Sequence, residues 1–192
     1  MPNSKSAYSF SNKKEKFDTH IIVVWVDNEA GVLARVVGLF SGRGYNIESL
    51  AVAQVDEKLK ISRITIVTTG TPQVVNQIKL QLRKLVPVHK VADFKREDKA
   101  VIFKEMALFK IVGPNNKLEG ALKACKKYNP VLLDKTKKSN VIQITALRRE
   151  IDKMSKDLKK FGLVSVSRTG AVAMTRGCLL YTSDAADDWW GG

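Results

Sequence analysis

A short loop before the first apolar helix pattern combines residues that suit the binding of a small carboxylate. Gly31 removes the side chain that would block a ligand, and a helix beginning beside it presents unpaired backbone N–H groups and a positive end. Asn28 lies in the same loop, and Asn46, further along, offers an amide that both donates and accepts hydrogen bonds. Val32 and Leu33 are aliphatic and can line a small pocket. If the loop binds a ligand, these groups together suit an apolar amino acid.

The same residues also have a purely structural interpretation. Asp27 or Asn28 can cap the helix, since both types accept hydrogen bonds from first-turn N–H groups. Gly31 can ease the turn, and Asn46 can begin the next strand. The residues alone leave both interpretations open.

Residues for catalysis are few. The chain has two histidines, His20 and His89, and neither has a local metal-ligand spacing, so both are expected to be structural. The sequence contains no nucleophile elbow, no P-loop and no zinc-protease motif. Cys125 follows the apolar spacing of a helix and is expected to be a buried core residue. These features predict a chain that is not an enzyme and holds no metal or cofactor.

The net charge of +14 raises the question of a nucleic-acid partner. The lysines are scattered along the chain, and aromatic residues do not alternate with them as in a stacking platform. We therefore expect a solvated basic surface without a nucleic-acid role, with docking on an acidic protein as a further alternative. No apolar run approaches the length of a membrane span, and the chain is expected to be cytoplasmic.

Strand and helix patterns alternate through the first half. Residues 20–26 form an apolar run typical of a strand covered on both faces. A helix is expected to end at Gly42, and a second to begin with Thr71 as cap and Pro72 in its first turn. Further strands are predicted at residues 46–55, 61–69 and 88–94. The order βαββαβ predicts a four-stranded antiparallel sheet with both helices on one face.

A similar order recurs after a charged linker. Strands are expected at residues 101–112, 130–134, 141–146 and 163–167, and helices at 117–128 and 147–161. The fold class is therefore α+β, with two ferredoxin-like βαββαβ domains in tandem. The expected divisions are a disordered tail at 1–18, a first domain at 19–95, a linker at 96–100, a second domain at 101–177, and a non-native tail at 178–192 that resembles translated adapter DNA.

Several segments carry a resemblance to one family. They are residues 28–40 (NEAGVLARVVGLF), 43–50 (RGYNIESL), 62–66 (SRITI), 77–78, 81–82, 84–86, 167–170 (SRTG) and 176–177. Together they resemble the small regulatory subunits of acetolactate synthase, over residues 20–177. The helix start alone resembles any ACT domain, a ligand-sensing βαββαβ module.

The resemblance implies a regulatory role in branched-chain amino acid biosynthesis. In this family ACT domains form a homodimer, and the effector, usually valine, binds between them. The resemblance assigns it to Asn28, Gly31, Val32 and Leu33 of one chain and to Asn46 and Ile47 of the other. A separate large subunit then carries out the synthase reaction with thiamine diphosphate, Mg²⁺ and FAD, and the small subunit stimulates it and confers feedback inhibition. The alternative is a free-standing ACT-domain transcriptional regulator, although no helix-turn-helix pattern adjoins the first domain.

Overall fold

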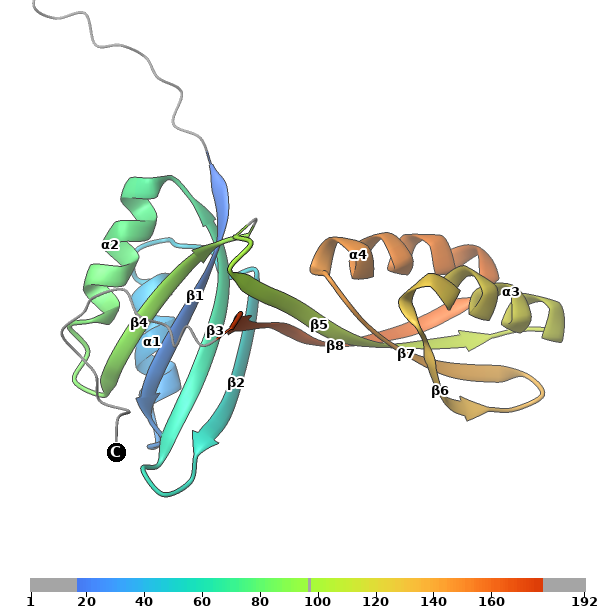
Figure 1. The fold of residues 1–192 in the computed structure, drawn as a ribbon, viewed down its shortest axis with the longest axis horizontal. Helices are drawn as coiled ribbons and strands as arrows, with labels where there is room; N and C mark the ends of the chain where they lie inside the picture. The colour runs from blue at the N-terminus through green and yellow to red at the C-terminus, as the bar shows by residue number, and fades with distance from the viewer. Residues whose placement is uncertain (1–16, 97, 178–192) are drawn as a thin grey trace, which may run out of the picture.

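The computed structural model describes residues 17–96 and 98–177. The expected C-terminal tail and most of the expected N-terminal tail lie outside these residues. Two sheets, each with two α-helices on one face, follow one another along the chain (Figure 1). The predicted class of two ferredoxin-like units is therefore confirmed.

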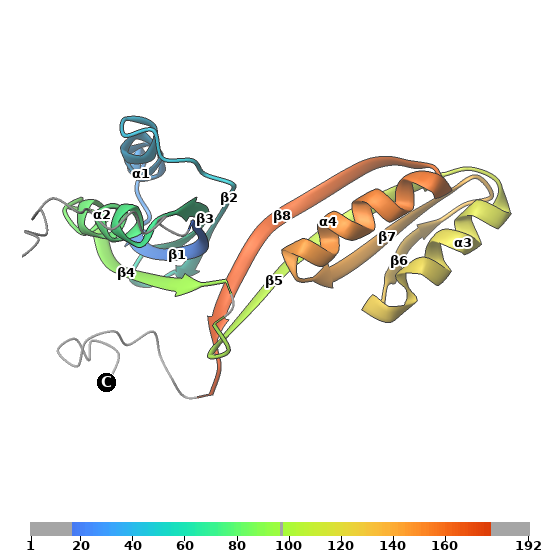
Figure 2. The ribbon, with the colours of Figure 1, turned by 90° about the horizontal axis from the view of Figure 1, so that it is seen from above.

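The first unit has the strand order β2-β3-β1-β4, all antiparallel. Its elements are β1 (Asp18–Asp27), α1 (Val32–Ser41), β2 (Ser49–Asp56), β3 (Ile61–Gly70), α2 (Pro72–Leu82) and β4 (Val88–Lys95). Thr71 caps α2 as expected, because its side chain accepts a hydrogen bond from the N–H of Val74 at 3.4 Å. Both helices lie on the same side of the sheet, with β2 and β4 at its edges (Figure 2).

The second unit repeats this arrangement with the strand order β6-β7-β5-β8. Its elements are β5 (Val101–Val112), α3 (Asn115–Cys125), the 3₁₀ turn η1 (Lys126–Tyr128), β6 (Val131–Lys135), β7 (Ser139–Ala146), α4 (Arg148–Asp157), the 3₁₀ turn η2 (Leu158–Phe161) and β8 (Leu163–Thr175). The two long helices expected from the sequence each end in a 3₁₀ turn. β8 runs on past the expected end at Ser167.

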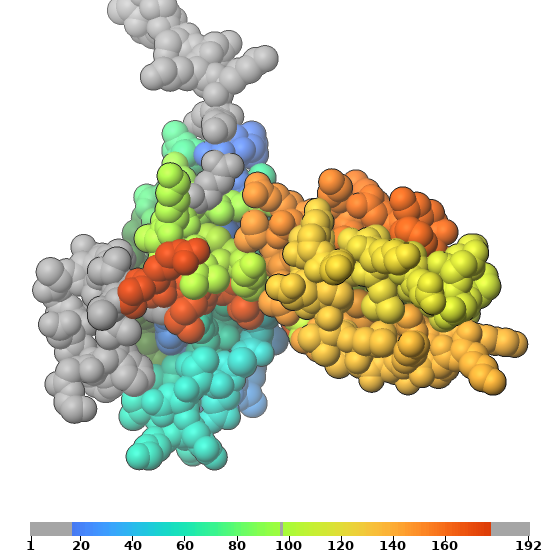
Figure 3. All heavy atoms as spheres, turned by 45° about the vertical axis from the view of Figure 1, so that its right-hand side comes forward, coloured from blue at the N-terminus to red at the C-terminus, as the bar shows by residue number. Residues whose placement is uncertain are grey.

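Strand β1 is apolar on both faces because both faces are covered. Ile22 and Val24 point toward the helices and join the first core, whereas Ile21 and Val23 point to the opposite face. There they are buried with Val101, Ala171 and Ala173, which come from β5 and β8. In Figure 3 the red end of β8 lies against the first unit. The start of β5 and the end of β8 therefore cover part of the face of the first sheet that is opposite α1 and α2.

Gly170 lets β8 approach the start of β2. Its φ is +81°, and a Cβ added there would lie 2.8 Å from Ser49 Oγ and 3.2 Å from the Leu50 carbonyl oxygen. The Ala171 N–H donates to Ser49 Oγ at 3.3 Å, so this contact joins the two units.

We expect Gly170→Ala to lower the free energy of unfolding by about 1–3 kcal/mol, because it adds left-handed strain and a clash. Urea denaturation measures this change. Gly38→Ala is the matched control, since a Cβ at Gly38 meets nothing within 4 Å and alanine favours the helix interior. Equal effects of the two substitutions would contradict the role given to Gly170.

Cys125 is fully buried in the second core, as expected, with its Sγ 3.7 Å from Met154 Sδ. Burial raises the pKa of its thiol to about 11.

A Cys178→Ser variant isolates this thiol for measurement. At pH 8.5 an ordinary thiol is about half ionised, whereas one with a pKa of 11 is ionised to about 0.3%. Alkylation by iodoacetamide should therefore be slow in buffer and fast in denaturant. The unfolded thiol loses its proton first as pH rises, so the folding stability contributed by this group should fall between about pH 9 and pH 11. Rapid native alkylation would mean that the core opens readily.

Candidate effector site at the edge of the first sheet

The loop between β1 and α1 is held by side chains that the sequence suggested as helix caps. Asn28 Oδ1 accepts a hydrogen bond from Ser62 Oγ at 3.0 Å, and Asp27 Oδ1 lies 2.6 Å from His89 Nε2. The N-cap of α1 is Gly31, and no side chain caps this helix. The expectation that Asp27 or Asn28 caps α1 is therefore wrong, because each is engaged by a neighbouring strand. The positive end of α1 consequently stays open to an anion.

Gly31 has a conformation and an environment that suit a close ligand. Its φ is +85°, in the left-handed region that glycine favours, and an added Cβ would meet nothing within 4 Å. The space in front of Gly31 is therefore open within a single chain. A ligand carboxylate can approach the helix backbone there without displacing another group.

The two aliphatic candidates divide between the core and the surface. Val32 is only 3% exposed and belongs to the first core, whereas Leu33 is 40% exposed. On the edge strand β2, Val52 is also exposed. Of Val32 and Leu33, only Leu33 therefore presents an apolar surface to solvent, while Val32 packs α1 against the sheet.

The second half of the candidate site lies between α1 and β2. Thr68 Oγ1 donates to the backbone carbonyl oxygen of Asn46 at 2.7 Å, which fixes the chain there. Asn46 is exposed, and its side chain makes no hydrogen bond to any residue that the structure describes. Ile47 is half-buried against the first core. The amide of Asn46 is thus available to a group from outside the chain.

A single chain does not bring the two halves together. Gly31 lies at the beginning of α1 and Asn46 lies beyond its end, and a helix of 10 residues is about 15 Å long. The strand register agrees, since Asp27 is opposite Ile61 at one end of the sheet. Thr68, which holds Asn46, pairs with His20 at the other end.

Each histidine lies beside one aspartate. His20 is 4% exposed, and its Nδ1 lies 2.8 Å from Asp93 Oδ1. His89 interacts with Asp27. Within residues 17–96 and 98–177, no three His, Cys, Asp or Glu side chains gather to hold a metal ion. In the same part of the chain, no helix has the length and apolar character required to cross a bilayer.

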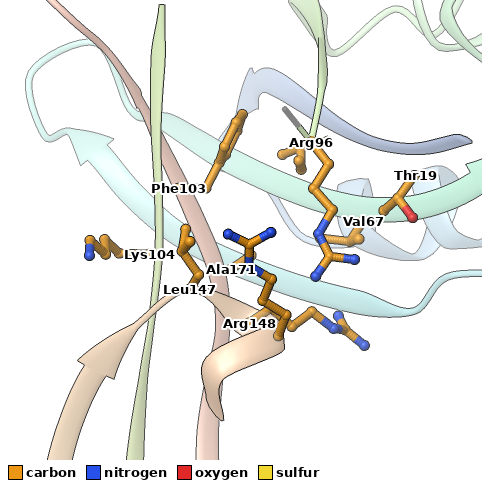
Figure 4. Close-up of a pocket in the computed structure, with 10 residues that line it drawn as sticks. Thr19, Val67, Arg96, Phe103, Lys104, Leu147, Arg148 and Ala171 are labelled. Carbon is orange, nitrogen blue, oxygen red and sulfur yellow. The ribbon is translucent and has the colours of Figure 1, made fainter. Parts of the chain in front are cut away.

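A cavity of about 600 Å³ lies elsewhere, between the open face of the first sheet and the second unit (Figure 4). Arg96, Arg148 and Arg149 line it. Sequence reasoning missed this site because its walls come from distant segments. The only local signal was the pair Arg148–Arg149 at the predicted start of a helix.

Comparison with known proteins identifies both units. A profile of the acetohydroxyacid synthase small subunit-like ACT domain matches residues 22–90, and one described as the small subunit of acetolactate synthase matches residues 104–177. Together these matches cover more than half of the chain.

Curated relatives and a solved structure agree with the profiles. The acetolactate synthase small subunit of Aquifex aeolicus is 38% identical over 165 residues, covering 85% of this chain and 84% of the relative. The small subunit of Buchnera aphidicola is 35% identical over 155 residues, covering 80% and 96%. The crystal structure of the Thermotoga maritima small subunit matches with a TM-score of 0.75 at 30% identity, covering 84% of this chain and 99% of that chain. The chain therefore belongs to the family of acetolactate synthase small subunits, and its first unit is an ACT domain.

Proposed function

We propose that this chain is the regulatory subunit of an acetolactate synthase and that it binds valine between two copies of its ACT domain. The single observation that carries the site is the separation of its two halves. The open helix end at Gly31 and the amide of Asn46 lie at opposite ends of α1, so one chain offers two half-sites. A second copy is needed to complete either of them.

The edge strand β2 supplies a way to pair two copies. Within residues 17–96 and 98–177, β2 is an edge strand whose ladder partner is β3, so its other backbone edge can pair with a further strand. Two β2 strands related by a two-fold axis would run antiparallel. The start of each strand, near Asn46, would then lie close to the Gly31 end of the partner. The exposed side chains of Leu33 and Val52 would be covered in the same interface.

Valine matches the groups in each completed site. Its carboxylate faces the uncapped N-terminus of α1, its ammonium faces the oxygen of Asn46, and its isopropyl group contacts Leu33 and Ile47. Asn28 and Val32 act indirectly in this proposal, since the first fastens the loop to Ser62 and the second fixes α1 to the core.

Regulation then follows from linkage between binding and assembly. Valine stabilises one arrangement of the ACT dimer, and that arrangement holds the large subunit in a less active state. A coupling free energy of about 1–3 kcal/mol is sufficient, and it acts in both directions. The large subunit contributes the chemistry, with thiamine diphosphate, Mg²⁺ and FAD, and condenses two pyruvates to acetolactate with release of CO₂ in the cytoplasm.

The test is co-purification with the large subunit, followed by an acetolactate assay with and without valine. The complex should be more active than the large subunit alone and should lose activity when valine is added. The small subunit alone should make no acetolactate even with all three cofactors. Turnover by the small subunit alone, or sequence-selective DNA binding in place of complex formation, would overturn the proposal.

A further inference from the structure

The cavity between the two units differs in character from the proposed valine site. Three apolar residues line it: Val67 of the ACT sheet, Phe103 of β5, and Leu147, which immediately precedes α4. Arg96 follows β4, whereas Arg148 and Arg149 open α4. A molecule held there would touch both units at once.

Positive charge is concentrated on this cavity. In Figure 4 the side chains of Arg96 and Arg148 extend into the same space from different walls. The guanidinium groups of Arg96 and Arg149 have no hydrogen-bond or ion-pair partner within residues 17–96 and 98–177. Arg148 Nη2 lies 3.3 Å from the carbonyl oxygen of Glu48 and 3.8 Å from Glu48 Oε2, so its interaction with Glu48 is weaker than that of a closely paired arginine.

The two arginines of α4 also stand where a helix disfavours cations. Arg148 and Arg149 are its first two residues, beside the positive end of the helix dipole. Glu150 offsets part of this charge, and its Oε2 accepts the N–H of Leu147 at 3.0 Å. Among the residues that the structure describes, the basic side chains of Arg96, Lys104, Arg148 and Arg149 line the cavity, whereas no Asp or Glu does. This excess of positive charge is relieved when an anion enters the cavity.

The remaining walls indicate the rest of the ligand. Val67, Phe103 and Leu147 give the cavity an apolar lining beside the arginines. A volume of about 600 Å³ is within the range for small organic ligands and far exceeds the space that an inorganic ion requires. Guanidinium groups bind carboxylate and phosphate oxygens in bidentate geometry.

From these features we propose a second ligand site in this chain, for a small organic dianion that carries an apolar body. Its charged head binds Arg96 and Arg149, with Arg148 beside them, and its body packs on Phe103, Leu147 and Val67. Because the site joins the ACT domain to the second unit, its ligand stabilises their relative placement. The cavity shares no lining residue with the valine site proposed at the β2 edge.

Calorimetric titration of the full chain in low-salt buffer tests this site, with phenyl phosphate as the probe. Inorganic phosphate tests the head alone, benzyl alcohol tests the body alone, and phthalate separates a dicarboxylate from a phosphate monoester. Phenyl phosphate or phthalate should bind at least about tenfold more tightly than either fragment. The better of the two identifies the head that the arginines prefer.

Variants locate the binding. Arg96→Gln and Arg149→Gln should each weaken the preferred probe about ten- to a hundredfold, because each removes a charged hydrogen-bond donor. Arg83→Gln is the matched control, since Arg83 is an exposed arginine at the end of α2 and away from the cavity. Thermal melting confirms that each variant is folded.

Two outcomes would overturn the proposal. One is that no probe binds. The other is that Arg83→Gln weakens binding as much as the cavity variants, which would indicate that the probes bind through the net charge of +14 and not at the cavity. The titrations need neither the large subunit nor valine, so they distinguish failure of this site from failure of the regulatory function.

Discussion

Gly31→Asp is expected to abolish valine inhibition and to weaken valine binding by at least about a hundredfold. The added side chain enters the open space in front of the helix end, where a Cβ meets no atom of the same chain. Its carboxylate then takes the place proposed for the carboxylate of valine, and juxtaposed like charges cost several kcal/mol. Calorimetry on the small subunit measures the binding, and the acetolactate assay measures the inhibition. Gly38→Asp, on the exposed part of α1, is the control for added charge.

Asn46→Ala should weaken valine binding by about 1.5–3 kcal/mol, because the charged groups of the ligand lose a polar partner. The backbone there should stay in place, since Thr68 holds the carbonyl oxygen of residue 46 and not its side chain. This variant therefore separates a loss of binding from a loss of folding.

Mixing the two variants tests the arrangement across the dimer. If each site joins Gly31 of one chain to Asn46 of the other, one site of the mixed dimer carries both substitutions and its second site carries none. Refolding the variants together should restore up to one tight valine site per mixed dimer. If both residues served the same site from one chain, every site would carry a substitution and no tight binding would return. That result would rule out pairing through the β2 edge as the origin of the site.

Arg168→Met is expected to destabilise the second unit by about 3–5 kcal/mol. Glu105 is 2% exposed, and Arg168 binds both of its oxygens, with Nε–Oε1 at 2.7 Å and Nη2–Oε2 at 2.8 Å. Arg168 Nη1 also donates to Asp152 Oδ1 at 2.6 Å. These hydrogen bonds raise the pKa of the Arg168 guanidinium. Removing the cation leaves a buried carboxylate without its counter-ion, and an unpaired buried charge strongly lowers the free energy of unfolding.

The double variant Arg168→Met with Glu105→Met distinguishes this cause from lost packing. It removes both charges and should recover most of the stability, because a buried ion pair and an apolar pair of similar volume are often close in free energy. Asp152→Ala should cost much less, since Asp152 is largely exposed. Urea denaturation of the three variants gives the comparison. A double variant as unstable as Arg168→Met would indicate that packing, not charge, accounts for the loss.

Features that depend on neighbouring residues were predicted well from the sequence. Thr71 and Pro72 begin α2 as expected, because a cap and the residues that it serves lie within one turn. The run at residues 20–26 is a strand covered on both faces, which its uninterrupted apolar character indicated. The repeated βαββαβ order and the family resemblance followed from the same local patterns.

Features that depend on distant residues required the tertiary structure. Asn28 was an equally good helix cap by sequence, and only the placement of Ser62, 34 residues later, decides its role. Val32 and Leu33 look alike in the sequence, but the angle at which α1 meets the sheet buries the first and exposes the second. Arg96 and Arg149 belong to segments with no shared pattern, and the packing of β5 and β8 on the ACT sheet places them on one cavity. The sequence by itself thus determined the elements, the fold class and the family. Which polar groups are left open to a ligand was decided by long-range hydrogen bonds and packing, because a side chain bonds whichever partner the fold brings within about 3 Å of it.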